Sequence, residues 1–486
     1  MWPMKIMKHL VAGVGLWGAV FCAGALAGAA NEELEALVAE AWAQNPQVAL
    51  AKYQVDGALA RRDELRGFFD PQLALSLEQT DSVLGYNQSS LSAGVDTAVL
   101  PGAYIGASLE ENYFNHLKGS YEYPDVQSDY NRLLQSMAGL RMGIPLLRDR
   151  GFRQWDLSDQ QALRNYSAAR NRFLEVTQSI RHNVELRYIG ILESLALWSV
   201  AQSATARVQK LLTEAEELVK LQTVPEYQLF AARSEVALRQ EEETFARQVY
   251  ENRLSRLAEL LGQSDQKPQV TTMPDGFTQW AETVDLQPTY SKDQARKARG
   301  DYRRILDQIG ATELEKARNM DNLRSDLSLH MEVDLQGEDP DRFIATQHFL
   351  SDHGLGGMIG LTWSRPWGYR AEHARVRALD AGLSERRELL RQIDLRIRTE
   401  LEVAHRDFRL AQKRFRLVIR AVFSARQALE AEDDRFRLGE GRSRNVLDAQ
   451  KDLTAALKRR TVLSAELLKT YFNFLFACGY SIQPSQ

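Results

Sequence analysis

The sequence predicts a mainly α-helical protein built from a tandem duplication of long helical hairpins, with a smaller set of amphipathic β-strands. Three observations support this prediction: a self-match at one fixed offset, long uninterrupted helical patterns, and alternating apolar and polar residues ahead of each long helix. Residues 151–262 align without a gap on residues 368–479, an offset of 217 (368 − 151). A self-match of this length indicates duplication rather than chance.

Each copy has the pattern of one long helix, a break and a shorter return helix. Gly151 to Gln222 would rise about 107 Å at the standard spacing, and the return helix Pro225 to Leu261 about 55 Å. The long helix carries a coiled-coil seam with steps of four and three, formed by Ile180, Val184, Tyr188, Ile191, Leu195 and Trp198.

Another helix is predicted before each set of strands. Glu32 to Arg66 has an interrupted apolar face and a break at Asn45-Pro46. Its duplicate runs from Pro288 to about Asn322, with Gly300 in the place of Pro46. At about 52 Å, this opening helix and the return helix together match the length of the long helix. Each half is therefore expected to form a two-stranded helical rod.

Four strands per chain are predicted from alternation, which requires one apolar and one aqueous surrounding. They lie at 73–77 and 138–144 in the first half, and at 327–335 and 359–363 in the second. A soluble β-sandwich gives the same pattern. The insertion 79–132 in the first half contains two further segments, 91–99 and 103–109, which suit a hairpin across Pro101-Gly102. The rest of the insertion reads as a surface loop.

The first 29 residues resemble a secretory signal peptide, with Lys5 and Lys8 before an apolar run and small residues up to Ala30. Whether Cys22 is ever lipidated stays open. Cys478 is the only other cysteine, so no disulfide is expected within the mature chain. The predicted domains are a first repeat at 30–262, a linker at 263–287, a second repeat at 288–479 and a tail at 480–486.

This order of elements resembles the TolC-like outer-membrane efflux proteins. Residues 145–151, Pro-Leu-Leu-Arg-Asp-Arg-Gly, are similar to the family's junction between strands and helix. Residues 436–450 are similar to its second helical tip, with a glycine, a serine and then Val-Leu-Asp-Ala. The resemblance implies a homotrimer in the outer membrane of a Gram-negative bacterium, with four strands per chain closing a 12-stranded β-barrel and the helices forming a periplasmic α-barrel. Under this reading the insertion is expected outside the membrane.

The family further implies a passive exit duct of a tripartite efflux or type I secretion system. Its partners would be outer-membrane lipid, a periplasmic adaptor and an inner-membrane pump of the RND, ABC or MFS type. A neighbouring ABC transporter gene would favour type I secretion, whereas a neighbouring gene for a proton-driven pump would favour drug or metal efflux. The alternative from another class is a soluble periplasmic coiled-coil scaffold with a small β domain. Trp363 and Trp367, which flank the last strand, suit an aromatic girdle.

Two sets of site residues follow from the resemblance. Asn445 and Asp448 occupy the positions where the family carries two acidic groups around the periplasmic gate; Asp448 alternatively serves the dipole of its own helix. The helical tips are expected to meet the adaptor, although ordinary turns have the same composition. The tip residues are Leu221, Gln222, Thr223, Val224, Leu438, Gly439, Gly441 and Ser443.

No catalytic constellation, cofactor motif or metal-ligand spacing is visible, so no enzyme is predicted. His405 to Arg426 is strongly basic. Export and the formal net charge of −4 argue against nucleic acid as its partner.

Overall fold

The computed structural model describes residues 25–81, 86–100, 102–116, 132–151, 153–220, 227–263, 268, 270, 274–284, 292–339, 354–437 and 443–480. The chain divides into two compact units, and each takes segments from both halves of the duplication. The helical unit comprises residues 1–54, 170–304 and 390–486. The sheet unit comprises residues 55–169 and 305–389.

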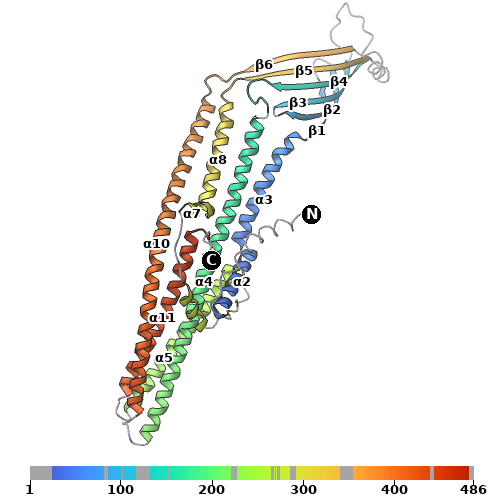
Figure 1. The fold of residues 1–486 in the computed structure, drawn as a ribbon. Coiled ribbons are helices and arrows are strands. Elements are labelled where there is room, and N and C mark those ends of the chain that lie inside the picture. The colour runs from blue at the N-terminus through green and yellow to red at the C-terminus, as the bar shows by residue number, and fades with distance from the viewer. Residues whose placement is uncertain are drawn as a thin grey trace, which may run out of the picture. The chain divides into compact units, whose positions relative to one another are not determined.

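The sheet unit contains one antiparallel sheet, which has six strands among the described residues. They are β1 (Gln72–Asp81), β2 (Tyr86–Leu100), β3 (Ala103–His116), β4 (Arg132–Pro145), β5 (Asp326–Asp339) and β6 (Gly354–Ser364). Their order across the sheet is their order in the chain, as Figure 1 shows. The pairing of β4 with β5 joins the first half of the duplication to the second.

The strand count of four was wrong, because the inserted segments pair into the sheet. The hairpin predicted at 91–99 and 103–109 is present as β2 and β3, which turn at Gly102 with φ 79°. It lies between β1 and β4. A lone hairpin is marginally stable in water, whereas pairing on both sides satisfies its backbone groups. The remainder of the insertion, 117–131, lies outside the described residues.

Four long helices connect to the strands: α3 (Pro46–Arg66), α4 (Arg153–Lys220), α8 (Gly300–Asp321) and α10 (Arg370–Arg437). Within the sheet unit, ion pairs link successive helices, namely Arg62–Asp159 at 3.0 Å, Arg164–Asp307 at 3.3 Å and Lys316–Asp380 at 2.6 Å. At the foot of the sheet, Arg148 after β4 binds Asp326 of β5 at 2.6 Å. These contacts fix the strands to the helix ends that enter the unit.

The duplicated hairpins have helices of equal length. α4 and α10 contain 68 residues each, while α5 (Tyr227–Leu261) and α11 (Ser443–Ala477) contain 35 each. Both return helices end on a glycine with positive φ, Gly262 at 81° and Gly479 at 68°. Each glycine N–H donates to the carbonyl three residues earlier, a common helix C-terminus. The predicted duplication of helical hairpins is confirmed.

The predicted break in the first opening helix is present, and the second opening helix is interrupted at the equivalent position. α2 (Ala25–Gln44) ends before Asn45, whose Oδ1 accepts from the N–H of Gln47 at 2.8 Å and whose Nδ2 donates to the carbonyl of Leu260 at 2.7 Å. Asn45 thereby caps α3, which starts on a proline, as suits a first helical position. In the second half, α7 (Lys292–Ala298) and α8 are separated at Arg299.

The core of the helical unit is a continuous apolar cluster along α4. Ile180, Val184, Tyr188 and Ile191 of the predicted seam are almost fully buried, whereas Leu195 and Trp198 are half-buried. The segment 263–287, expected only to link the halves, contains a helix, α6 (Pro274–Thr283). Its Phe277 and Trp280 are buried in the same cluster. The segment therefore contributes to the core, and α6 packs against α2 and α11.

Of the expected leader at 1–29, residues 1–24 lie outside the described residues, so the leader stays a prediction. No helix in the described part of the chain is both long and apolar enough to cross a membrane.

Candidate functional site

The sheet has one apolar face that extends over all six strands. Two rows of directly paired residues cross it from β1 to β6. The first row is Leu75, Ala93, Leu109, Ala138, Leu335 and Leu355, and the second is Leu73, Val95, Ala107, Leu140, Val333 and Gly357. Several of these side chains are exposed, including Leu75 at 74%, Leu109 at 60% and Leu355 at 75%. An apolar face this wide and uncovered indicates a non-aqueous neighbour.

The opposite face is polar. One row contains Ala74, Gly94, Ser108, Gly139, Asp334 and Gly356, and the next contains Gln72, Asp96, Gly106, Arg141, Glu332 and Met358. Arg141 of β4 binds Asp96 of β2, with Nε to Oδ1 at 2.9 Å. This ion pair passes over Gly106 of β3, where an added Cβ would lie 1.9 Å from the Asp96 carboxylate. A charged pair on this face and leucines on the other require water on one side only.

The predicted gate residues lie on the exposed side of α11, close to its start. Asn445 and Asp448 are one helical turn apart and both exposed, whereas Val446 between them is fully buried against Leu211 of α4. Within the described part of the chain, no ion pair or side-chain hydrogen bond holds Asp448. The structure therefore leaves both polar groups accessible, and their role as a gate stays a prediction.

The predicted tips fall mostly outside the described residues. These are Leu221, Gln222, Thr223, Val224, Leu438, Gly439 and Gly441. Ser443 begins α11. Adaptor docking at these positions is therefore a prediction too.

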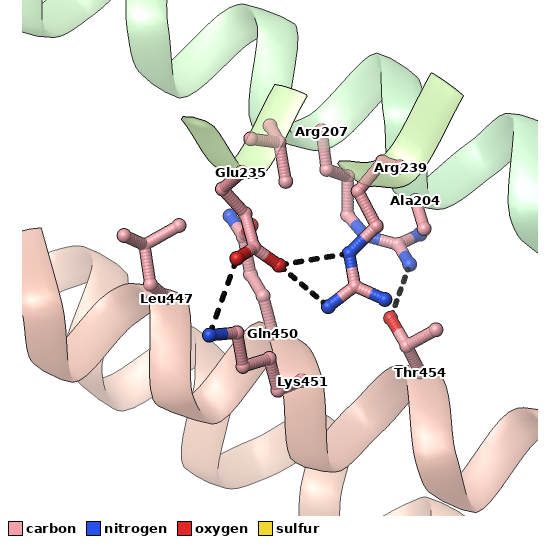
Figure 2. A pocket seen from close by; sticks show the side chains of 9 residues that line it. Ala204, Arg207, Glu235, Arg239, Leu447, Gln450, Lys451 and Thr454 are labelled. Carbon is pink, nitrogen blue, oxygen red and sulfur yellow. Dashed lines mark hydrogen bonds and ion pairs between the residues drawn. The ribbon is translucent and has the colours of Figure 1, made fainter. Parts of the chain in front are cut away.

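A charged cluster that the sequence analysis missed lies on the first turns of α11. Figure 2 shows it between α4, α5 and α11. Glu235 of α5 binds Arg239 at 2.7 Å and Lys451 of α11 at 3.2 Å. Arg207 of α4 donates from Nη2 to the hydroxyl of Thr454 at 3.2 Å. We call these five residues the tip cluster.

The tip cluster is unevenly neutralised. Arg239 also binds Glu242 at 2.9 Å, so two carboxylates neutralise it. Arg207 has no acidic partner among the described residues, and its buried Nε has no acceptor. Burial, reinforced by repulsion from Arg239, lowers the pKa of the Arg207 guanidinium below its ordinary value.

A sequence signal for Arg207 exists in hindsight. It lies among Ala204, Val208 and Leu211, which are buried at helical spacing on α4. The duplicated position is Ser424, at the same offset of 217 (424 − 207). A cation at the edge of an apolar stripe, absent from the other copy, marks a contact particular to the first hairpin.

Among the described residues, no group of three or more histidine, cysteine or acidic side chains is arranged to hold a metal ion. The tip cluster consists of the ion pairs of Glu235 with Arg239 and Lys451, and the hydrogen bond from Arg207 to Thr454. The candidate functional features are therefore an amphipathic sheet in the sheet unit and a charged cluster in the helical unit.

Comparison with solved structures gives the fold class. The channel protein CusC matches with a TM-score of 0.68 and 15% identity, covering 92% of each chain. VceC, an outer membrane protein of Vibrio cholerae, matches with a TM-score of 0.65 and 15% identity over 92% of this chain and 96% of VceC. The MtrE outer membrane channel of Neisseria gonorrhoeae, in its open state, matches with a TM-score of 0.66 and 13% identity over 92% of this chain and 89% of MtrE.

The chain therefore has the TolC-like fold of outer-membrane channels over nearly its whole length. At this level of identity the likeness establishes the fold alone. No family model matches the sequence, and no curated protein sequence does.

Proposed function

We propose that the chain is an outer-membrane channel that serves as the exit duct of a tripartite efflux or type I secretion system. The observation that carries this proposal is the six-stranded sheet with one apolar and one polar face, in a chain with the fold of outer-membrane channels. A barrel wall needs lipid on one side and water on the other, and strands alternate accordingly. The exposed Trp363 and Trp367 suit the aromatic girdle at a membrane interface.

The sheet requires partners if it spans a membrane. β1 and β6 are the edges of the sheet, and each pairs with a single neighbour among the described strands. Unpaired strand edges cannot face lipid, so the sheet must close by pairing β6 of one copy with β1 of the next. We infer that three copies form the assembly, with the strands in the outer membrane of a Gram-negative cell and the helices in the periplasm.

The transport step itself requires no chemistry from the duct. An inner-membrane pump would supply the energy, and a periplasmic adaptor would join it to the helical tips. The exposed Asp448 would form a ring of three carboxylates in such an assembly, which favours cations over anions at the periplasmic entrance. Because Asn445 is uncharged, it would not add a second ring of carboxylates.

The proposal is tested first by membrane fractionation. A barrel stays with the outer membrane after a carbonate wash, whereas a soluble coiled-coil scaffold is released. Purified protein is then placed in a planar bilayer, where discrete ion conductance is expected. Release by carbonate, or the absence of conductance in a correctly folded oligomer, would contradict the channel.

The gate is tested with two single substitutions. Asp448→Ala is expected to lower the cation selectivity of the conductance. Asp452→Ala is the matched control, because Asp452 is an exposed carboxylate one turn further along the same helix. An equal effect of both substitutions would mean that Asp448 acts only as general surface charge, and no effect of either would contradict the gate.

A further inference from the structure

The inserted hairpin, β2 with β3, occupies the middle of the sheet. β2 pairs with β1 along the whole of β1, and β3 pairs with β4 from Tyr104 to Asn115. We propose that the inserted hairpin is a membrane-spanning part of the channel wall. Each chain then contributes six wall strands, and three chains contribute eighteen. This rests on the proposed function and replaces the expectation of a 12-stranded barrel with the insertion outside the membrane.

The apolar face of the sheet continues across the inserted hairpin. Ala93, Val95, Ala107 and Leu109 belong to the two apolar rows and connect those of β1 with those of β4. Ile105 adds a third apolar position, paired with Met142. A hairpin in water would not need apolar residues on one face in register with both neighbours. This match indicates that the hairpin and its neighbours meet the same lipid.

The polar face also continues across it. Ser92 pairs with Ser76, and their hydroxyls lie 2.7 Å apart. Asp96 reaches over Gly106 to Arg141, so β2 and β4 are held together on the polar face. Because Gly106 has no side chain, the two charged groups meet directly above β3. The inserted hairpin therefore has water on the same side as the rest of the wall.

The strands are long enough to cross a bilayer. β2 has 15 residues and β3 has 14, against 10 in β1 and 11 in β6. A tilted transmembrane strand needs about 9–11 residues. On β5, which pairs with β4, the alternating apolar residues from Leu327 to Leu335 extend about 26 Å at ~3.3 Å per residue. That length is comparable to the ~25 Å apolar band of outer-membrane barrels.

Adding a hairpin preserves the closure of the wall. β1 runs away from the helices and β4 runs back towards them, so two extra strands between them keep every neighbour antiparallel. Barrel diameter grows roughly linearly with strand number. Eighteen strands therefore predict a barrel about 1.5 times as wide as twelve strands would give.

The inference is tested by nitroxide spin labels on single cysteines in a Cys478→Ala background, with the protein reconstituted in lipid vesicles. Val95→Cys and Leu109→Cys place labels on the apolar face of the hairpin, and Ser92→Cys and Ser108→Cys on its polar face. Leu75→Cys and Leu335→Cys serve as references outside the hairpin. Collisions with oxygen, which concentrates in lipid, are compared with collisions with a water-soluble nickel chelate.

The expected result is a high oxygen-to-nickel ratio at Val95 and Leu109, equal to that at the references and severalfold above Ser92 and Ser108. Nickel access at Val95 and Leu109 with protected references would overturn the inference and leave a four-stranded wall. Shielding of these two labels from both reagents would overturn it also, because the hairpin would then be covered by protein. Nickel access at the references as well would contradict the proposed channel itself.

A deletion gives an independent measurement. Removing residues 86–131 deletes β2, β3 and the following segment and leaves β1 antiparallel to β4. In end-on electron-microscope views, the wild-type barrel is expected to be about 1.5 times as wide as that of the deletion variant. Equal widths would overturn the inference. If the deletion variant does not assemble, the spin-label result decides.

Discussion

Two arginines of the tip cluster are expected to respond to the same substitution with opposite signs. Arg207→Met removes a half-buried cation that lacks a carboxylate partner among the described residues, while Arg239→Met removes a cation bound by two carboxylates. Methionine keeps much of the length and packing of arginine. The comparison therefore isolates the charge and its partners.

The expected magnitudes follow from the partners. Arg207→Met loses one hydrogen bond to Thr454, whose hydroxyl can turn to the carbonyl one helical turn back. It removes an unsatisfied buried donor and repulsion between two cations, so a gain of roughly 0.5–1 kcal/mol is expected. Arg239→Met leaves Glu235, only 8% exposed, with Lys451 as its one ion-pair partner in the described part of the chain. A loss of about 1–3 kcal/mol is expected there.

The assay is urea unfolding of the purified protein in detergent, followed by the helical signal in circular dichroism. Arg207→Met should raise the urea midpoint and Arg239→Met should lower it. Raising the salt concentration should shrink both shifts, because half-exposed charges are screened. A loss of stability in Arg207→Met as large as that in Arg239→Met would refute the reasoning. It would mean that Arg207 is bound by an acceptor in the assembled protein.

Three further predictions concern the helical unit. Burial raises the pKa of the Cys478 thiol from 9.0 to about 12, so folding disfavours the thiolate. The contribution of this thiol to the free energy of unfolding is therefore fully present below pH 9 and is lost between pH 9 and 12, by at most about 4 kcal/mol. The Cys478→Ala variant should not show this loss of stability when it is unfolded at alkaline pH. Asn45→Ala removes a helix cap and a buried hydrogen bond, and it should lower the free energy of unfolding in urea by about 2 kcal/mol. An unchanged urea midpoint would contradict this prediction. Gly300→Ala would place Cβ 2.5 Å from the backbone nitrogen of Glu175 and should cost about 1–3 kcal/mol. Gly57→Ala, whose Cβ meets nothing within 4 Å in α3, is the control and should stabilise by roughly 0.5–1 kcal/mol.

The duplication and the long helices could be predicted from the sequence because they repeat a strong local pattern. A seam such as Ile180, Val184 and Tyr188 has a period that suits one structure only, and the equal offset of both copies fixes the helix limits. The break in the first opening helix was predictable for a related reason. Asn45-Pro46 combines a capping side chain with a residue that cannot continue a helix.

The tip cluster was not predictable, because its ion pairs and its hydrogen bond connect three separate helices. Glu235 and Lys451 are far apart in the sequence, and periodicity says nothing about which exposed-type side chains meet. Ion pairs between separate helices depend on the rotation of each helix, which is decided by the packing of the core. The only sequence signal for the cluster was Arg207, a cation at the edge of an apolar stripe.

The inserted hairpin shows where a correct local prediction led to a wrong count. Its turn at Gly102 was predictable from two residues, yet its membership of the sheet depended on register with β1 and β4, which no local pattern contains. Its apolar face uses small residues such as Ala93 and Ala107, so its alternation is weaker than that of Leu73 and Leu75. Register nevertheless constrains the hairpin strongly, because a slip of one residue would turn Asp96 towards the apolar face and separate it from Arg141. The ion pair over Gly106 and the apolar rows thus specify the same alignment from opposite sides of the sheet, which is the physical reason to place the hairpin within the wall.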